Sequence, residues 1–144
     1  KYLLLHSNER KMKILSYFVK TYPISCLCIV VIWIVCLIPI PETPLDNVKM
    51  IDKWTHFVMY GGLCTLLWLE YGLHHQSIEW KKMAFYAVLL PILLGGWVEI
   101  VQATCTGGNR SGEFLDFLAD GVGVFLGMII GIPLALMLSK RSRD

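Results

Sequence analysis

Apart from Glu70, which lies near the end of its run, four ionisable residues lie within apolar segments of this sequence, where a charged side chain is costly. They are His56, Glu99, Asp116 and Asp120. An imidazole beside carboxylates can transfer protons as an acid and base, and the same groups can bind a divalent metal ion. Because ionisable groups in membrane helices usually face protein or a water-filled cavity, we take these four as candidate catalytic residues.

One segment near the C-terminus carries two of these acids and a series of small residues. Asp116 and Asp120 are one helical turn apart, and Gly123, Gly127 and Gly131 follow at four-residue steps. In a helix these residues share one face, and small residues at this spacing let two helices approach closely inside a membrane. The pattern predicts a tightly packed membrane helix, with its glycines facing either the same chain or a second copy.

The composition is typical of a membrane protein. Of the 144 residues, 56% are hydrophobic, and the mean hydropathy is +0.58, which exceeds the usual apolar share of a soluble domain. The net charge of +2 indicates no basic face for nucleic acid. Most of the five cysteines lie in apolar runs, and we interpret them as small apolar residues, not as a disulfide framework.

Four apolar runs have the length of membrane helices, which need roughly 20 residues. They cover residues 23–40, 54–73, 83–104 and 114–138. We therefore predict an all-α polytopic membrane protein, in which residues 1–144 form one domain with four transmembrane helices in a compact bundle. A basic lead-in precedes the first run but no cleavage site follows it, so we expect an uncleaved helix and not a signal peptide.

The distribution of Lys and Arg orients this bundle. These residues gather before the first run, between the second and third runs, and after the fourth. With four spans the three regions share one side, which the positive-inside rule makes cytoplasmic. Both termini are then cytoplasmic, and the loops near 41–53 and 105–113 are outside.

This orientation brings polar residues of three helices to a similar depth. At a rise of about 1.5 Å per residue, His56, Glu99 and Asp120 lie about 3–10 Å below the outer boundary. Glu70 lies at the opposite end of its span and is expected to be solvated. Neighbouring polar residues are candidates for substrate binding: Lys53, Tyr60, Gln102 and Arg110.

Structural explanations compete with these roles. Asp116 near a helix N-terminus would interact favourably with the helix dipole. His56 would form a hydrogen bond with Asp52 one turn earlier, and Arg110 would be a solvated loop charge. Asp120 and Glu99 are the deepest and the hardest to explain in this way.

Four short motifs resemble the VanZ-like family of bacterial integral membrane proteins. They are DKWTHFVMY at 52–60, EIVQ at 99–102, Arg110, and DFLADGVG at 116–123. They match, in order, that family's DK-x-x-HF-x-x-Y stretch, E-x-x-Q helix, loop arginine and D-x-x-AN-x-x-G helix. Asp120 departs from the pattern, because the family has asparagine there.

The resemblance implies a multi-pass protein of the bacterial cytoplasmic membrane that acts on the cell envelope. The founding member of the family is linked to low-level resistance to teicoplanin, a glycopeptide antibiotic. The expected partners are therefore a membrane lipid, a lipid-linked cell-wall precursor or the antibiotic, and no nucleic acid.

Three functions are compatible with these residues. The first is an outward-facing polar pocket near the extracytoplasmic face that binds or modifies a lipid headgroup or a lipid-linked precursor. The second is an intramembrane hydrolase or transferase, which would use acid–base catalysis or a metal ion. The third is a proton- or ion-coupled transporter. No HExxH or GxSxG signature occurs, so no metal or other cofactor is predicted.

Overall fold

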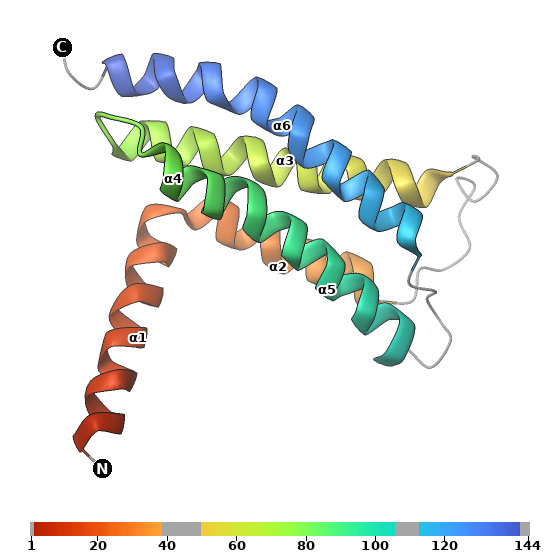
Figure 1. The fold of residues 1–144 in the computed structure, drawn as a ribbon, viewed down its shortest axis with the longest axis horizontal. Helices are drawn as coiled ribbons and strands as arrows, with labels where there is room; N and C mark the ends of the chain where they lie inside the picture. The colour runs from red at the N-terminus through yellow and green to blue at the C-terminus, as the bar shows by residue number, and fades with distance from the viewer. Residues whose placement is uncertain (1, 39–49, 106–112, 142–144) are drawn as a thin grey trace.

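A computed structural model of the chain describes residues 2–38, 50–105 and 113–141, and these form helices with no strand (Figure 1). The elements are α1 (Tyr2–Thr21), α2 (Pro23–Leu37), α3 (Ile51–His74), α4 (Trp80–Met83), the π-helical segment η2 (Ala84–Leu89), α5 (Leu90–Cys105) and α6 (Phe114–Arg141). The predicted all-helical class is confirmed. Helices α2, α3, α5 and α6 lie alongside one another, and α1 projects away from them (Figure 1).

Two helices in the described part of the chain are long and apolar enough to cross a membrane. They are Trp80–Cys105, which joins α4, η2 and α5, and Phe114–Ser139 in α6. Glu9–Thr21 and Pro23–Leu37 together form a third candidate, bent by 99°. Helix α3 is less apolar because its sequence includes polar residues such as His56 and Glu70, both of which are buried.

Prolines explain where the first predicted run differs from the structure. Helix α2 ends at Leu37, and Ile38 has an extended backbone conformation, because the residue before a proline, here Pro39, is disfavoured in a helix. At the other end, Tyr22 precedes Pro23 and also leaves the helical region. This break separates α2 from α1, a helix where we had expected only a basic lead-in.

Another proline explains the π-helical segment. Pro91 has no backbone N–H and cannot donate to the carbonyl four residues earlier. The wider turns of η2 come immediately before it, and Leu90 donates to the Phe85 carbonyl five residues back. The third predicted run, 83–104, is therefore one helix with a π-bulge, a feature often found at functional sites.

Glycine residues let α3 and α6 pack with their backbones in contact. A Cβ atom at Gly123 would collide with the Phe57 carbonyl oxygen, and one at Gly127 would collide with that of Gly61. The Thr65 hydroxyl lies between two carbonyls, 2.9 Å from that of Gly61 in its own helix and 3.3 Å from that of Gly127 in α6. The glycine series of α6 thus packs within the chain.

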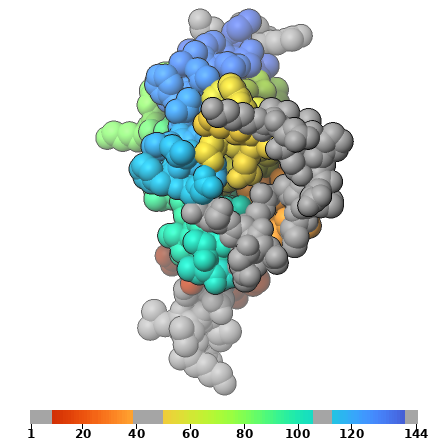
Figure 2. Space-filling view, turned by 90° about the vertical axis from the view of Figure 1, so that its right-hand side faces the viewer, coloured from red at the N-terminus to blue at the C-terminus, as the bar shows by residue number. Residues whose placement is uncertain are grey.

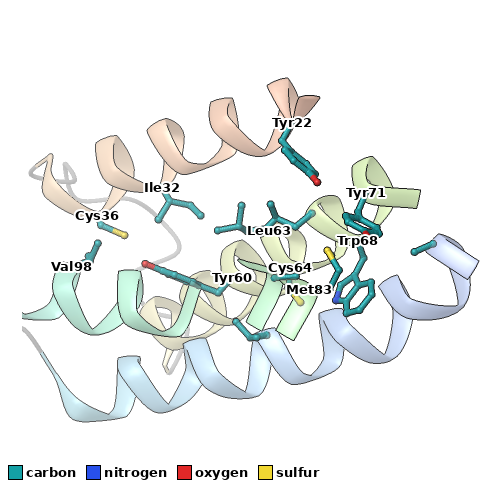
Figure 3. Close-up of a cluster of buried hydrophobic side chains, with 14 residues drawn as sticks. Tyr22, Ile32, Cys36, Tyr60, Leu63, Cys64, Trp68, Tyr71, Met83 and Val98 are labelled. Atoms are coloured by element: carbon teal, nitrogen blue, oxygen red, sulfur yellow. The ribbon is translucent and has the colours of Figure 1, made fainter. Parts of the chain in front are cut away.

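The hydrophobic core lies along α3, between α2, α5 and α6 (Figure 3). Ile32 of α2, Leu63 and Trp68 of α3 and Val98 of α5 are at most 2% exposed. Many other large apolar side chains face outward, as in Trp97 and Phe125. An apolar exterior around a packed interior is what a lipid solvent permits.

Glu70 corrects one expectation. We expected a solvated side chain, but Glu70 is only 3% exposed. Its carboxylate accepts hydrogen bonds from the Ile24 amide (2.9 Å), the Ser25 amide (3.0 Å) and the Ser25 hydroxyl (2.6 Å). The first amides of a helix lack partners within it, so Glu70 of α3 caps the N-terminus of α2. The sequence did not reveal that α2 begins beside the end of α3.

Candidate functional site

Three of the four candidate catalytic residues meet between α3, α5 and α6. His56 Nδ1 lies 3.0 Å from Asp120 Oδ1 and 3.5 Å from Glu99 Oε1. His56, Glu99 and Asp120 are 2%, 8% and 0% exposed. We call these three residues the buried cluster. Figure 2 views the molecule from this end, where the starts of α3 and α6 lie beside the end of α5.

A glycine on α5 makes room for this arrangement. A Cβ atom at Gly95 would collide with Asp120 Oδ2. Gly95 precedes Glu99 by one helical turn, so α5 presents both its small residue and its acid to α6. The close approach of Asp120 to His56 therefore depends on the absence of a side chain at position 95.

Asp116, the fourth candidate, is paired with a lysine. Lys53 Nζ lies 3.1 Å from Asp116 Oδ1 and 2.7 Å from Glu113 Oε2. Asp116 is 1% exposed, whereas the Glu113 side chain is 47% exposed. We call Lys53, Glu113 and Asp116 the lysine bridge, because Lys53 joins a buried carboxylate to an exposed one. The hydrogen bond to Glu113 is the main cause that raises the pKa of Lys53, at the end of its helix, above the ordinary value.

The buried cluster and the lysine bridge share one contact. The backbone amide of Glu113, immediately before α6, donates to Glu99 Oε2 across 2.8 Å. Glu99 therefore satisfies one of the amides that the start of a helix leaves without an internal partner. This contact ties the end of α5 to the start of α6.

The other candidate substrate-binding residues have different surroundings. Tyr60 is fully buried, and its ring lies nearly parallel to that of His56 with centroids 6.3 Å apart. Its hydroxyl has no hydrogen-bond partner among the described residues. Gln102 Nε2 donates to the Cys36 carbonyl across 2.9 Å and so holds the end of α2. Arg110 lies outside the described residues.

The buried cluster contains more hydrogen-bond acceptor atoms than the donors of the described residues satisfy. Within the described ranges, Glu99 Oε1 and Asp120 Oδ2 have no hydrogen-bond partner. Buried polar atoms in proteins are nearly always satisfied. The arrangement therefore has capacity for a proton, a water molecule or a cation at these oxygens.

Two apolar hollows lie along α3 and α6 and share Phe57 as a lining residue, and we call them together the groove. Its first part has a volume of about 360 Å³ and reaches from Lys53 to Phe57. A second part, of about 470 Å³, continues from Phe57 toward the middle of both helices. The first part is lined by Met50, Lys53, Trp54, Phe57, Ala119 and Val122.

Sequence reasoning missed two residues that shape the site. Glu113 was not among the candidate site residues, although its side chain accepts a hydrogen bond from Lys53. Gly95 was not singled out, although its position one turn before Glu99 was visible in the sequence. Both act through contacts with other helices, which the spacing along one helix does not reveal.

Comparison of the chain with protein-family models, curated proteins and solved structures finds no match. The function of the chain is therefore inferred from the geometry of the site and from the four sequence motifs.

Proposed function

We propose that the chain is a VanZ-like protein of the bacterial cell envelope, and that its buried cluster and lysine bridge bind or modify the headgroup of a membrane lipid or lipid-linked cell-wall precursor. The observation that carries the proposal is the meeting of His56, Glu99 and Asp120 from three helices. A charged group at mid-bilayer costs about 2.5–3.5 kcal/mol even on lenient scales. Maintaining three ionisable groups at one buried point is more consistent with binding or chemistry than with packing alone.

In this proposal the chain crosses the cytoplasmic membrane four times, through α2, α3, the helix of α4, η2 and α5, and α6. Both termini are cytoplasmic, and the buried cluster lies near the outer face. The polar residues of α3 do not exclude it as a span, because His56 and Glu70 are buried against other helices. Helix α4, which contains Lys81 and Lys82, lies at the end of the bundle opposite the starts of α3 and α6 (Figure 1), and the positive-inside rule would make that end cytoplasmic.

Helix α1 would lie in the cytoplasmic surface of the membrane. It turns by 99° from α2, so it lies parallel to the membrane if α2 crosses it. Arg10, Lys13 and Lys20 share one side of the helix, and Met12, Leu15 and Val19 lie on the opposite side, which Lys11 borders. An amphipathic basic helix of this kind binds in the interface between headgroups and acyl chains.

The groove beside Lys53 favours a lipid over a water-soluble ligand. A headgroup at the lysine bridge would have an apolar path for its acyl chain past Trp54 and Phe57. Because the groove is on the outside of α3 and α6, a lipid would enter it sideways from the membrane. A lipid-linked precursor has the same combination of polar head and apolar tail.

One observation favours chemistry as well as binding. His56 Nδ1 lies within 3.5 Å of two carboxylates, an arrangement in which an acid can orient an imidazole that transfers protons. A hydrolase or transferase acting on the bound headgroup is therefore the second candidate function.

Lipids that copurify with the protein test the proposal. Ala119 lines the groove, so Ala119→Trp should fill it, whereas Ala103→Trp at an exposed position of α5 is the matched control. Mass spectrometry should find a lipid class enriched over the bulk membrane with the wild type and Ala103→Trp, and lost with Ala119→Trp. An equal lipid composition in all three samples would contradict lipid binding at this groove.

A further inference from the structure

The three side chains of the buried cluster are arranged as ligands of one metal ion would be. One ligand atom from each of His56, Glu99 and Asp120 lies within 4.8 Å of the other two. Two atoms bound to an ion at about 2.1 Å lie about 3.0–3.4 Å apart for octahedral to tetrahedral angles. The distances of 3.0 Å and 3.5 Å from His56 Nδ1 to the two carboxylates match this spacing.

A second observation comes from the atoms that remain unsatisfied. Asp120 is completely buried, and its Oδ2 atom has no hydrogen-bond partner in the described parts of the chain. That atom occupies the position that a Cβ atom at Gly95 would need. Glu99 Oε1, on the side facing His56, is also without a described hydrogen-bond partner. An ion between these side chains would give Glu99 Oε1, which lies 3.5 Å from His56 Nδ1, the partner that it lacks.

The charge balance also favours a cation. Two carboxylates of the buried cluster face one imidazole, and Lys53 is already paired with Asp116 and Glu113. Desolvated carboxylates close together cannot all ionise cheaply. A divalent ion compensates both charges at once, whereas a proton compensates one.

A neighbouring set of possible ligands is less suitable. Asp52, His56 and Asp116 also lie close enough together to share an ion. In that set, however, Asp116 is paired with Lys53 at 3.1 Å, and a lysine ammonium repels a metal ion. The buried cluster is therefore the better site.

We infer that the buried cluster binds one divalent transition-metal ion through His56 Nδ1 and one carboxylate oxygen each from Glu99 and Asp120. One imidazole with two carboxylates suits ions such as Mn²⁺ and Zn²⁺. Three protein ligands leave coordination positions open. The inference rests on the proposed function in one respect, since the ion would give an otherwise acidic site the positive charge that a phosphate headgroup requires.

Titration with Mn²⁺, followed by electron paramagnetic resonance, tests the inference on full-length protein that has been stripped with a chelator and placed in nanodiscs. The wild type should bind one Mn²⁺ per chain. Loss of a residue that only supports a metal ligand already costs about 10–100-fold in affinity. Glu99 is itself a proposed ligand, so Glu99→Gln should weaken binding by about a hundredfold. Glu79→Gln, an equal change at an exposed glutamate paired with Lys82, should leave the affinity unchanged.

Circular dichroism and size-exclusion chromatography establish that each variant is folded. If Glu99→Gln does not fold, His56→Gln replaces it, with the same loss of affinity expected. A folded wild type that binds no stoichiometric Mn²⁺ or Zn²⁺, or a folded variant that binds them as well as the wild type, overturns the inference. Lipid copurification is a separate measurement, so a metal-free protein that still enriches a lipid would remove the metal site and leave the proposed function standing.

Discussion

The carboxylate of Asp120 occupies the space that a Cβ atom at Gly95 would need. This relationship between α6 and α5 places Asp120, the least exposed acid among the described residues, against His56. Asp120 is also the position at which the sequence departs from the VanZ-like pattern. The geometry around it therefore depends on a neighbour that has no side chain.

Gly95→Ala should displace Asp120 from His56 and so impair the function of the site. The new methyl group meets Asp120 Oδ2, and the carboxylate must rotate away. We expect Mn²⁺ affinity to fall by about tenfold or more, as for loss of a supporting contact. Gly121→Ala, beside Asp120 but facing open space, is the control. Equal affinity in the two variants would show that Asp120 does not need its observed position.

The α3–α6 contact predicts opposite effects for two glycines of one helix. A Cβ at Gly127 meets the Gly61 carbonyl and the Cys64 side chain, whereas one at Gly121 meets nothing within 4 Å. Gly127→Ala should destabilise the protein by about 1–3 kcal/mol, as overpacking does. Gly121→Ala should be neutral or stabilise it by up to about 1 kcal/mol, because alanine favours a helix. Unfolding in detergent measures both, and equal stabilities would contradict the packing described.

Glu70 should stabilise the protein through the start of α2. Glu70→Gln places an amide hydrogen donor against the amides of Ile24 and Ser25, and an unsatisfied buried group costs about 1–3 kcal/mol. We expect a lower midpoint of thermal unfolding without loss of Mn²⁺ binding, because Glu70 lies at the other end of α3 from His56. Glu79→Gln again serves as the control, and an unchanged midpoint in Glu70→Gln would show that the cap contributes nothing.

The sequence was informative about spacing along helices and uninformative about contacts between them. Hydropathy predicted the helical class, and the charges in apolar runs identified His56, Glu99 and Asp120 as a group. The burial of Glu70 depends on where α2 begins relative to α3. The periodicity of a sequence does not contain this information. The partner of Gln102 is a backbone carbonyl on α2, and backbone acceptors leave no signature in a sequence.

Helix α1 should have one side in lipid and the other in water. We expect a spin label at Leu15 to be accessible to oxygen, which concentrates in lipid, and a label at Lys13 to be accessible to an aqueous nickel complex. The labels require a variant whose five native cysteines are replaced. Equal accessibility at the two positions would mean that α1 does not lie in the membrane surface.

The most direct test of the proposed function compares the lipids and lipid-linked cell-wall precursors of bacteria that produce the wild type, Glu99→Gln or Glu79→Gln. Mass spectrometry of the whole extract detects a ligand or product without assuming its identity. Immunoblotting establishes that the membranes contain equal amounts of each protein. Relative to cells without the gene, we expect a lipid or precursor to be altered in mass or abundance in cells that produce the wild type or Glu79→Gln. In cells that produce Glu99→Gln, we expect that species to be the same as in cells without the gene. Identical profiles with the wild type and Glu99→Gln would contradict the proposed function.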